Sequence, residues 1–574
     1  MIRKTKATSA AALTAVAALS LAACGGGSKD GGEAAGGEAE KGGTLHYLTF
    51  KPAESLDPQR IYIGRDIFNT SRLVYRGLLQ FPVGEQDPIK AQTPIPDIAE
   101  EVPTSKDGKT WTFKLKSGVK WEDGKDVTCE DFKYGVSRNF ASDVLDGGPF
   151  QYPTGYLDIP KDKDGSSRYK GPYKKTGQDL FDKAVTCKGN ELTYKFNKPW
   201  ADFPAAVAGL HAFAPYREDK DQGAKNKLVV FSNGPYKLEG AWSKNKGGTF
   251  VRNDQYDPKT DEGTRAANPD KIVFTQGLEN EIIADRLVKD SGDDKYAITD
   301  RNIPPSKFAT VKPAESRTTN VTSPYVFYLV PNVKNMPNVK VRQALATATD
   351  KEAYIAAEGG SKASEPAVSI INPSMEGYAE NPAFKDIPAA GDPEAAKKLL
   401  EESGVKTPVK LKVTYQKSPI MDKAFRALKE GWDKAGFDTQ LNPMGDTYYD
   451  VINKPSNDSD VFQGGWGADY PSLATVLPLL FDGGQLSAAN VGNNYGRYDN
   501  PEVNKAFEDA LTIEDPKEAA AAYQKVDVTL GEDYAYIPLD IQKFYFLRGS
   551  KVTGYQQTEA TSMFPDLGTI GVAK

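Results

Sequence analysis

The residue types best suited to ligand binding gather in one short segment, GGWGADYPS (residues 464–472). Asp469 is a single carboxylate in an otherwise neutral loop, and Trp466 and Tyr470 offer flat aromatic faces. Three glycines let another backbone approach closely. They are Gly464, Gly465 and Gly467. The same segment also fits a tight loop in which Trp466 packs in the core and Asp469 caps the next helix.

The amino terminus has the pattern of a secretory signal. A short basic region precedes an apolar stretch from about Ala10 to Ala23, shorter than the roughly 20 residues that span a bilayer. The stretch ends in Leu-Ala-Ala-Cys24, which resembles a bacterial lipobox. That resemblance implies a lipoprotein signal peptide over residues 1–23 and lipidation of Cys24. The alternative is an ordinary signal cleaved after Ala-x-Ala, with Cys24 incidental.

Residues 24–42 have the composition of a flexible tether. They are mainly glycine, alanine and charged residues, which cannot bury enough apolar surface to order the chain. We expect acyl chains on Cys24 to hold the protein at the outer face of the cell membrane, or in the periplasm. The tether then lets a folded body reach a partner at that surface.

Few residues suit metal or redox chemistry. With Cys24 lipidated, an exported protein has Cys129 and Cys187 left, and these are expected to form a disulfide. The alternative is a pair of buried free thiols. His46 and His211 are the only histidines and are expected to be structural, so neither a metal site nor a cofactor is predicted.

Bulk composition narrows the function classes. The net charge of −6 argues against nucleic acid as a partner, because its binders carry basic faces. The 574-residue chain exceeds the limit of about 250–300 residues for one core, so at least two lobes are expected. No Gly-x-Ser-x-Gly or His-Glu-x-x-His motif occurs, which argues against a hydrolase.

The second half of the chain predicts an open α/β lobe. Strands and helices alternate in the order that produces parallel pairing. The predicted elements are strands 409–416, 437–444 and 459–466 and helices from Ser418 to about Gly436 and over 446–454. Ligands of open α/β sheets bind outside the carboxyl ends of strands, where the third strand places Asp469. A capped helix from Asp392 to Gly404 precedes this unit, and a long helical region over 500–534 follows it.

The first half predicts shorter elements. They are a strand at 44–50, a hairpin over 110–121, a helix over 129–141 capped by Thr128, and a strand at 191–198. Trp111 and Trp121 of the hairpin are expected in the core. Residues 153–177 are rich in Lys, Asp, Gly and Pro, which indicates a surface insertion.

Several stretches, in order along the chain, resemble the family 5 solute-binding proteins, the oligopeptide- and dipeptide-binding components of bacterial ABC importers. They are SLDP (55–58), VYRGLLQF (74–81), the 96–138 block, NGPYKLEGAW (233–242), PNVKVRQALATATDK (337–351), GWGADYPS (465–472) and IPLDIQKF (537–544). The 96–138 block, with its W-x-F-x-L-x-x-G-V-x-W-x-D-G core, is the most specific of these.

The resemblance implies an α/β, two-lobed periplasmic-binding-protein-like fold of class II, cluster C type. A small extra domain is inserted in lobe one and holds both remaining cysteines. The implied boundaries are 43–85 with 231–318 and 537–574 for lobe one, 86–230 for the extra subdomain, and 319–536 for lobe two.

The resemblance also implies site residues. Asp469 occupies the position whose carboxylate pairs with a peptide α-ammonium, and backbone groups of Gly465, Trp466 and Gly467 would bond the peptide main chain. Tyr470 belongs to the same segment. Tyr62, Tyr325 and Phe327 are further candidates, although single aromatic residues of this kind are more often core. Arg65 and Lys454 are weak candidates for binding a peptide carboxylate.

The implied function is capture of peptides outside the cell and delivery to an ABC permease driven by cytoplasmic ATPases. The chain is expected to be a monomer and not an enzyme. The segment Asp-Tyr-Pro-Ser (469–472) departs from the Asp-Tyr-Asn-Glu-Pro of many relatives. Ligand class therefore stays open, with oligosaccharides, chelated metal or haem as alternatives and a peptide-signal sensor as another role.

Overall fold

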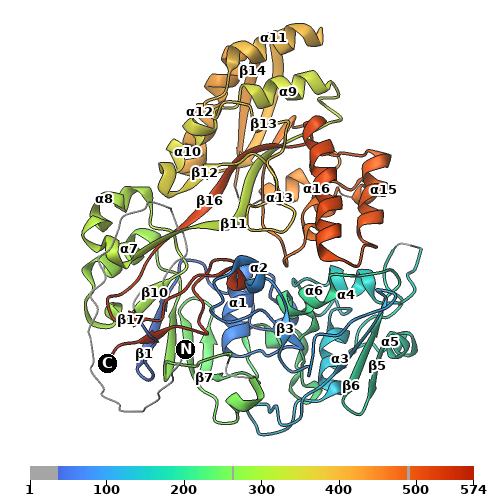
Figure 1. The fold of residues 1–574 in the computed structure, drawn as a ribbon, viewed down its shortest axis with the longest axis vertical. Helices are drawn as coiled ribbons and strands as arrows, with labels where there is room; N and C mark the ends of the chain where they lie inside the picture. The colour runs from blue at the N-terminus through green and yellow to red at the C-terminus, as the bar shows by residue number, and fades with distance from the viewer. Residues whose placement is uncertain (1–36, 164, 262–263, 446, 488–490) are drawn as a thin grey trace, which may run out of the picture. The chain divides into compact units, whose positions relative to one another are not determined.

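Two β-sheets, each built from distant parts of the chain, organise the structure (Figure 1). It is a computed structural model that describes residues 37–163, 165–261, 264–445, 447–487 and 491–574. The predicted signal peptide, Cys24 and most of the predicted tether lie outside the described residues.

The larger sheet has the strand order β12-β16-β11-β15-β13-β14. Its strands are β11 (Thr318–Pro331), β12 (Ser364–Pro366), β13 (Val409–Gln416), β14 (Phe437–Met444), β15 (Val461–Trp466) and β16 (Ile537–Leu547). β13 pairs in parallel with both β14 and β15, as the alternation of strands and helices predicts. Helices α12 (Pro419–Ala435) and α13 (Tyr448–Ile452) make the two crossovers.

Local sequence signals set the helix ends in this lobe. The side chains of Asp392 and Ser418 accept backbone hydrogen bonds at the starts of α11 (Pro393–Ser403) and α12. Both helices end at a glycine with positive φ, a conformation that other residues adopt only with strain. These are Gly404 (φ +71°) and Gly436 (φ +108°). The predicted caps and stops are confirmed.

The long helical region predicted over 500–534 is wrong in one respect. It is divided into α15 (Pro501–Ala510) and α16 (Pro516–Glu532). Asp515 accepts hydrogen bonds from the first turn of α16, and Pro516 lacks the N–H that a continuous helix would need. The two helices pack against each other.

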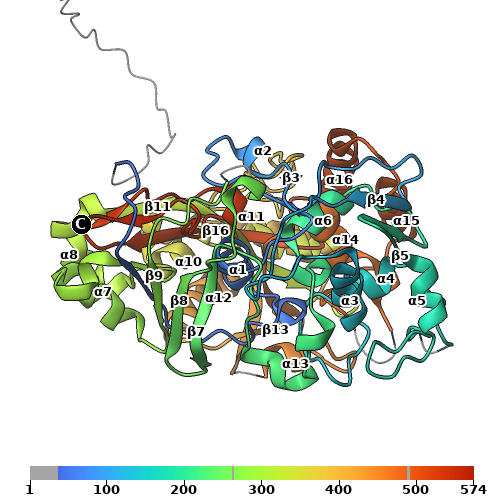
Figure 2. The same ribbon diagram turned by 90° about the horizontal axis from the view of Figure 1, so that it is seen from below.

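Strands β11 and β16 run side by side over most of their length (Figures 1 and 2). Their antiparallel pairing extends from Thr318 opposite Leu547 to Leu329 opposite Ile537. The register shifts between Thr322 and Val326, where Pro324 cannot donate a ladder hydrogen bond. This irregularity separates the end of β11 near lobe one from the end inside the six-stranded sheet.

The second sheet belongs to lobe one and has the order β10-β1-β9-β8-β7. Its strands are β1 (Thr44–Leu48), β7 (Tyr236–Ser243), β8 (Gly247–Arg252), β9 (Lys271–Thr275) and β10 (Ala297–Thr299). β1 is paired in parallel on both edges, and its Leu45, Tyr47 and Leu48 are fully buried. The predicted strand at 44–50 is therefore confirmed.

Fully buried ion pairs join segments of lobe one to the start of the predicted extra subdomain. Asp97 lies between Arg76 (2.8 Å) and Arg265 (2.8 Å), and Arg265 also contacts Asp261 at 2.8 Å. All four side chains are at most 1% exposed. Removing one partner of such a pair leaves a buried charge, at a cost of about 3–5 kcal/mol.

The region predicted as an extra subdomain contains a three-stranded sheet, β4-β6-β5. These strands are β4 (Thr110–Lys114), β5 (Val185–Lys188) and β6 (Glu191–Lys195). The predicted hairpin over 110–121 is wrong, because β4 pairs with β6. Trp111 and Trp121 are nevertheless buried, at 6% and 1% exposure, in a separate hydrophobic cluster.

The other elements are shorter. The helices are α1 (Gly64–Leu73), α2 (Pro88–Ala91), α3 (Cys129–Arg138), α4 (Gln151–Tyr156), α5 (Gln178–Ala184), α6 (Phe203–Gly209), α7 (Asn280–Lys289), α8 (Phe308–Val311), α9 (Val339–Thr347), α10 (Lys351–Glu358) and α14 (Leu477–Phe481). Two small ribbons pair β2 (Leu79–Gln80) with β3 (Ile95–Pro96) and β17 (Val552–Thr553) with β18 (Gly571–Val572). Thr128 caps α3 as predicted, in a capping box with Asp131.

Contacts cross several of the predicted domain boundaries, as two examples show. Residues 37–42, assigned to the tether, hydrogen-bond with the folded chain, for example from Gly42 N to Asn268 O at 2.8 Å. Strand β16, assigned to lobe one, is part of the six-stranded sheet of lobe two. Composition does not reveal such backbone pairing, and the domain boundaries stay a prediction.

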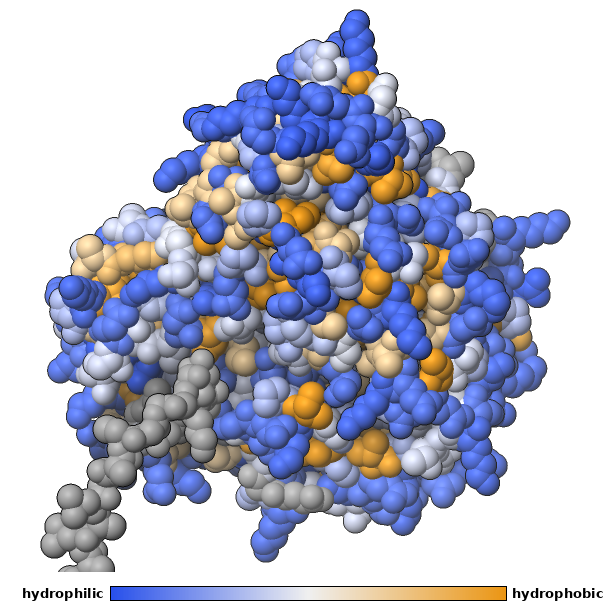
Figure 3. All heavy atoms as spheres, turned by 45° about the horizontal axis from the view of Figure 1, so that its top comes forward, coloured by the Kyte–Doolittle hydropathy of each residue, from blue (hydrophilic) through white to orange (hydrophobic). Residues whose placement is uncertain are grey.

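The surface is mainly hydrophilic on the face seen in Figure 3, where hydrophobic residues form small separate groups. Within the described part of the chain, no helix combines the length and apolar composition needed to cross a membrane.

Cys129 at the start of α3 and Cys187 on β5 form a disulfide, with Cα atoms 5.8 Å apart. We predict that replacing both with serine lowers the thermal midpoint, because the bridge closes a loop with a sequence separation of 58. The expected loss is about 2–4 kcal/mol of stability. Mass spectrometry of a non-reduced digest checks the premise, and finding both peptides unlinked would contradict it.

Candidate functional site

A cavity of about 260 Å³ brings together most of the residues that the sequence predicts for ligand binding. Its walls come from the segment that begins α1, from the irregular part of β11, and from the end of β15 with the loop that follows. The predicted residues that line it are Tyr62, Tyr325, Gly465, Trp466, Gly467 and Asp469. Segments more than 400 residues apart thus meet at one cavity, as shown by the hydrogen bond between Tyr62 and Asp469, with a sequence separation of 407.

Asp469 is held in this cavity by two tyrosines. Its Oδ2 accepts a hydrogen bond from Tyr62 Oη at 2.7 Å and one from Tyr152 Oη at 2.5 Å. Its backbone N–H donates to Thr475 Oγ1. Oδ1 has no hydrogen-bond partner among the described residues, so one carboxylate oxygen stays available to a ligand.

The environment of Asp469 raises the pKa of its carboxyl group above the value of an exposed aspartate. Burial raises the pKa of Asp469 to about 6, and the hydrogen bonds from Tyr152 and Tyr62 oppose that rise. Among the residues that the structure describes, no basic side chain lines the cavity to stabilise the carboxylate. A cationic group of a ligand would supply the missing positive charge.

Tyr152 was not predicted from the sequence. It lies on α4, immediately before the stretch predicted as a surface insertion, and is only 5% exposed. Its ring stacks on Trp200 at 5.9 Å between centroids, which fixes the direction of the hydroxyl group. No local signal marks this tyrosine, because its role depends on contact with a loop 317 residues away.

Tyr470, predicted as a ligand contact, does not line the cavity. It is 3% exposed, and its hydroxyl accepts a hydrogen bond from Trp200 Nε1 at 3.1 Å. Its ring packs against Tyr152. Tyr470 therefore points away from Asp469 and supports the loop from behind.

The glycines of β15 make room for side chains of β11. The sequence suggested instead that they let another backbone approach closely. A Cβ on Gly464 would lie 2.6 Å from the ring of Tyr328, and one on Gly465 would lie 2.6 Å from the ring of Phe327. Both rings belong to β11, directly opposite in register. Phe327 is therefore a packing partner of Gly465 and does not line the cavity.

One edge of β15 is without a strand partner near the cavity. β11 pairs with its whole length, but β13 pairs with it only at Val461 and Phe462. Among the described residues, no strand pairs with positions 463–466 on that second edge. At the cavity wall, the backbone of Gly465 and Trp466 therefore pairs with β11 on one edge and with no described strand on the other.

Neither predicted carboxylate partner is at the cavity. Arg65 is buried in ion pairs with Asp66 (2.8 Å) and Asp300 (3.0 Å). Lys454 is exposed and does not line the cavity. The charge of Arg65 is therefore already paired with two carboxylates and is not available to a ligand.

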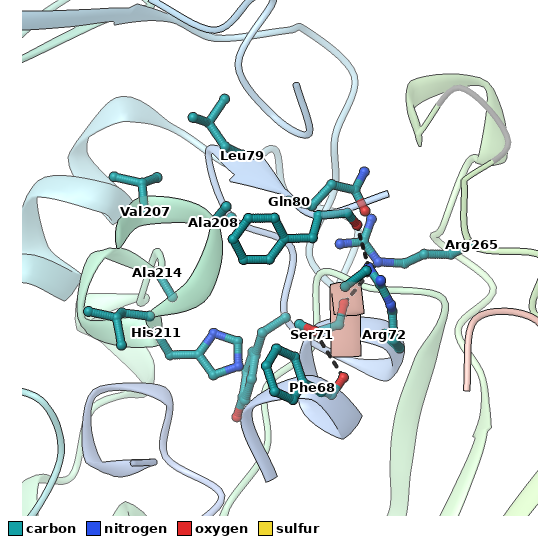
Figure 4. A pocket seen from close by; sticks show the side chains of 15 residues that line it. Phe68, Ser71, Arg72, Leu79, Gln80, Val207, Ala208, His211, Ala214 and Arg265 are labelled. Atoms are coloured by element: carbon teal, nitrogen blue, oxygen red, sulfur yellow. Dashed lines mark hydrogen bonds between the residues drawn. The ribbon is translucent and has the colours of Figure 1, made fainter. Parts of the chain in front are cut away.

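His211 lies beside a different and much smaller cavity (Figure 4). Its Nε2 is 2.9 Å from Thr70 Oγ1 and 3.2 Å from Ile67 O, so the ring is used in packing α1. The cavity volume of about 20 Å³ has room for one water molecule. Arg72 and Arg265 at its edge donate to backbone carbonyls of Phe81 and Ser71, which closes it to a larger ligand.

Comparisons with known proteins agree with this architecture. Residues 93–488 match the bacterial extracellular solute-binding proteins, family 5 middle. The chain is 26% identical over 463 residues to the oligopeptide-binding protein OppA of Bacillus subtilis, which covers 78% of this chain and 79% of the relative. It is 27% identical over 548 residues to heme-binding protein A of Haemophilus influenzae, covering 90% of each.

The solved structure of clavulanic acid biosynthesis oligopeptide binding protein 2 is similar, with a TM-score of 0.84 and 26% identity. The match covers 94% of this chain and 97% of that one. The chain belongs to the bacterial extracellular solute-binding proteins of family 5. The predicted two-lobed α/β fold is confirmed.

The ring-over-glycine contacts give a stability prediction. Gly465→Ala should destabilise the protein by about 1–3 kcal/mol, because the new Cβ forces the Phe327 ring to move. Gly445→Ala is the matched control, since a Cβ there would meet nothing within 4 Å. Thermal unfolding of the two variants checks this, and equal midpoints would contradict the packing argument.

The contacts of Asp469 give a second prediction. Tyr152→Phe removes one hydrogen bond that lowers the pKa of Asp469, so that pKa should rise by roughly half a unit to one unit. NMR titration of the labelled carboxyl carbon measures it. Tyr134→Phe is the control, because Tyr134 donates instead to Asp221. An unchanged Asp469 pKa in Tyr152→Phe would show that the bond does not form in solution.

Proposed function

We propose that this protein captures peptides outside the cell and delivers them to an ABC import permease. The observation that carries the proposal is Asp469, a partly buried carboxylate in a cavity where, within the described structure, one of its oxygens is free and no lining residue is basic. A peptide α-ammonium has a pKa of about 7.7–8.0 and is largely charged near neutral pH. It would give Asp469 a charge-assisted hydrogen bond, stronger than a neutral one.

The open edge of β15 supports an extended ligand. A peptide whose ammonium lies at Asp469 would pass the backbone of Gly467, Trp466 and Gly465, which also line the cavity. Pairing with these main-chain groups gives affinity that does not depend on the peptide's side chains. The named relatives include oligopeptide-binding proteins, which agrees with this ligand class.

The remaining parts of the proposal concern partners and location. Cys24 would carry the lipid that holds the protein at the outer face of the cell membrane. The folded body would act as a monomer, without catalysis, and dock on the transmembrane subunits of an importer with cytoplasmic ATPases. The lipobox-like segment and membership of an extracellular solute-binding family support this location.

Asp469→Ala should weaken the binding of an unmodified peptide by roughly 30-fold to several thousand-fold. Truncating one partner of a buried charge pair costs about 2–5 kcal/mol, at 1.4 kcal/mol per tenfold change. Asp438→Asn, at an exposed position of β14, is the matched control. Isothermal titration calorimetry measures both, and an unchanged affinity in Asp469→Ala would remove Asp469 from the site.

Peptide affinity should be greatest between about pH 6 and pH 8. The pKa of Asp469 is about 6 without a ligand, so below that pH the carboxyl must lose a proton before it can pair with an ammonium. Affinity should then fall about tenfold per pH unit, and it should fall again above about pH 8 as the peptide amine becomes neutral. The affinity of an N-acetylated peptide should show neither the fall below about pH 6 nor the fall above about pH 8. A flat profile for the free peptide would contradict the ion pair.

The deciding experiment is a thermal shift measurement on ligand-stripped protein. Free peptides of two to six residues, their N-acetylated forms, haem and oligosaccharides are compared. A ligand at 100 times its Kd adds about 2.7 kcal/mol of stability. Stabilisation by free peptides alone supports the proposal. Stabilisation by haem or sugars alone would show that the ligand class is wrong while the family stands.

A further inference from the structure

A second and larger cavity, of about 410 Å³, lies on the other side of the loop that carries Asp469. Its volume is within the range of about 300–1,000 Å³ found for small-molecule sites. It shares no lining residue with the cavity at Asp469. Tyr470 stands between them, since Asp469 lines the first cavity while Pro471 and Ser472 line the second.

The walls of this second cavity come from the predicted extra subdomain and from lobe two. The start of α6 and the segment after α2 provide one side, and the first part of α16 provides the other. Figures 1 and 2 show α16 and α6 facing each other. Two hydrogen bonds join these two parts beside the cavity. One runs from Gln92 Nε2 to Ser374 O at 2.8 Å and the other from Ser472 Oγ to Asp202.

Asp202 supplies a negative charge that has no ion-pair partner among the described residues. Its Oδ2 accepts the hydrogen bond from Ser472, and no basic side chain of the described residues forms an ion pair with it. Burial raises the pKa of its carboxyl group. Glu376 and Asp515 also line the cavity, against a single lysine, Lys517. The cavity is therefore negative overall and favours a cation.

A second polar group lies near this carboxylate. Tyr523, on α16, lines the cavity and is 2% exposed, and its hydroxyl has no hydrogen-bond partner within the described structure. Tyr523 and Asp202 line the same cavity, and burial together with the charge of Asp202 raises the pKa of Tyr523. Leaving a buried hydroxyl without a partner is unfavourable, so a ligand group that bonds to it gains affinity.

The rest of the lining suits an apolar body. The side chains that contribute here are Ile89, Pro94, Pro204, Pro471, Leu473 and Ala520. Ile89 is 49% exposed. A ligand that covered it would remove apolar surface from water.

We propose that this second cavity binds a small organic ammonium ion with an apolar or aromatic body, with its charge at Asp202. The site is separate from the proposed peptide site at Asp469. Because the walls of the cavity come from the extra subdomain and from lobe two, a bound ligand stabilises the contact between these two parts.

The test is calorimetric titration of 2-phenylethylamine into the full-length Asp469→Asn variant, in which the first cavity cannot pair with the amine. We expect saturable binding with a Kd of about 10 µM to 1 mM. 2-Phenylethanol and phenylacetate have nearly the same shape but are neutral and anionic, and each should bind at least about tenfold more weakly. No saturable binding of the amine, or equal binding of the alcohol, would overturn the proposal.

Variants then locate the site. Adding Asp202→Asn should weaken amine binding at least about tenfold. Asp515→Asn is the matched control and should leave it within about twofold, because that exposed side chain already caps α16. Unchanged binding in Asp202→Asn would show that the amine binds elsewhere.

A further variant covers the case in which Asp202→Asn does not fold. Tyr523→Phe removes only a hydroxyl that has no partner, so folding should be unaffected. Amine affinity should fall about threefold to tenfold. If the affinity does not change, the amine does not occupy this cavity.

Discussion

The pairing of β11 with β16 is the contact on which the site depends. The two strands stay together from Thr318–Leu547 to Leu329–Ile537, so the end beside lobe one and the end inside lobe two belong to one ladder. Where the register shifts, Pro324 and Tyr325 leave the regular ladder and line the cavity. The rest of β11 fixes β15 through rings that lie on Gly464 and Gly465. The position of Asp469 follows from that strand.

The order of lobe one depends on a different kind of contact. Buried arginine–aspartate pairs such as Arg76–Asp97–Arg265 join its segments to the start of the predicted extra subdomain, between partners that lie up to 168 residues apart. Such pairs give little net stability but penalise wrong arrangements strongly, because a misplaced partner leaves a bare charge in the interior. Arg65 belongs to this framework, which explains why a basic residue near the cavity is unavailable to a ligand.

Sequence patterns predict what depends on local physics. The caps at Asp392 and Ser418, the glycine stops and the parallel β13–β14–β15 unit follow from spacing and residue type. The position of Asp469 after a strand also follows from the pattern, and its role in binding stays a prediction. Non-local pairing was not predictable in this way. Trp111 and Phe113 alternate as in a hairpin, yet β4 pairs with β6, and Tyr152 reaches Asp469 only through the fold.

The two tyrosines on Asp469 have a consequence for the speed of ligand capture. Tyr62 and Tyr152 come from the amino-terminal part of the chain, and both donate to the same carboxylate oxygen of Asp469. These two hydrogen bonds therefore join the two predicted lobes at the cavity itself. Any separation of the lobes must break both bonds, so a substitution at either phenol would change how fast a ligand enters as well as how tightly it is held.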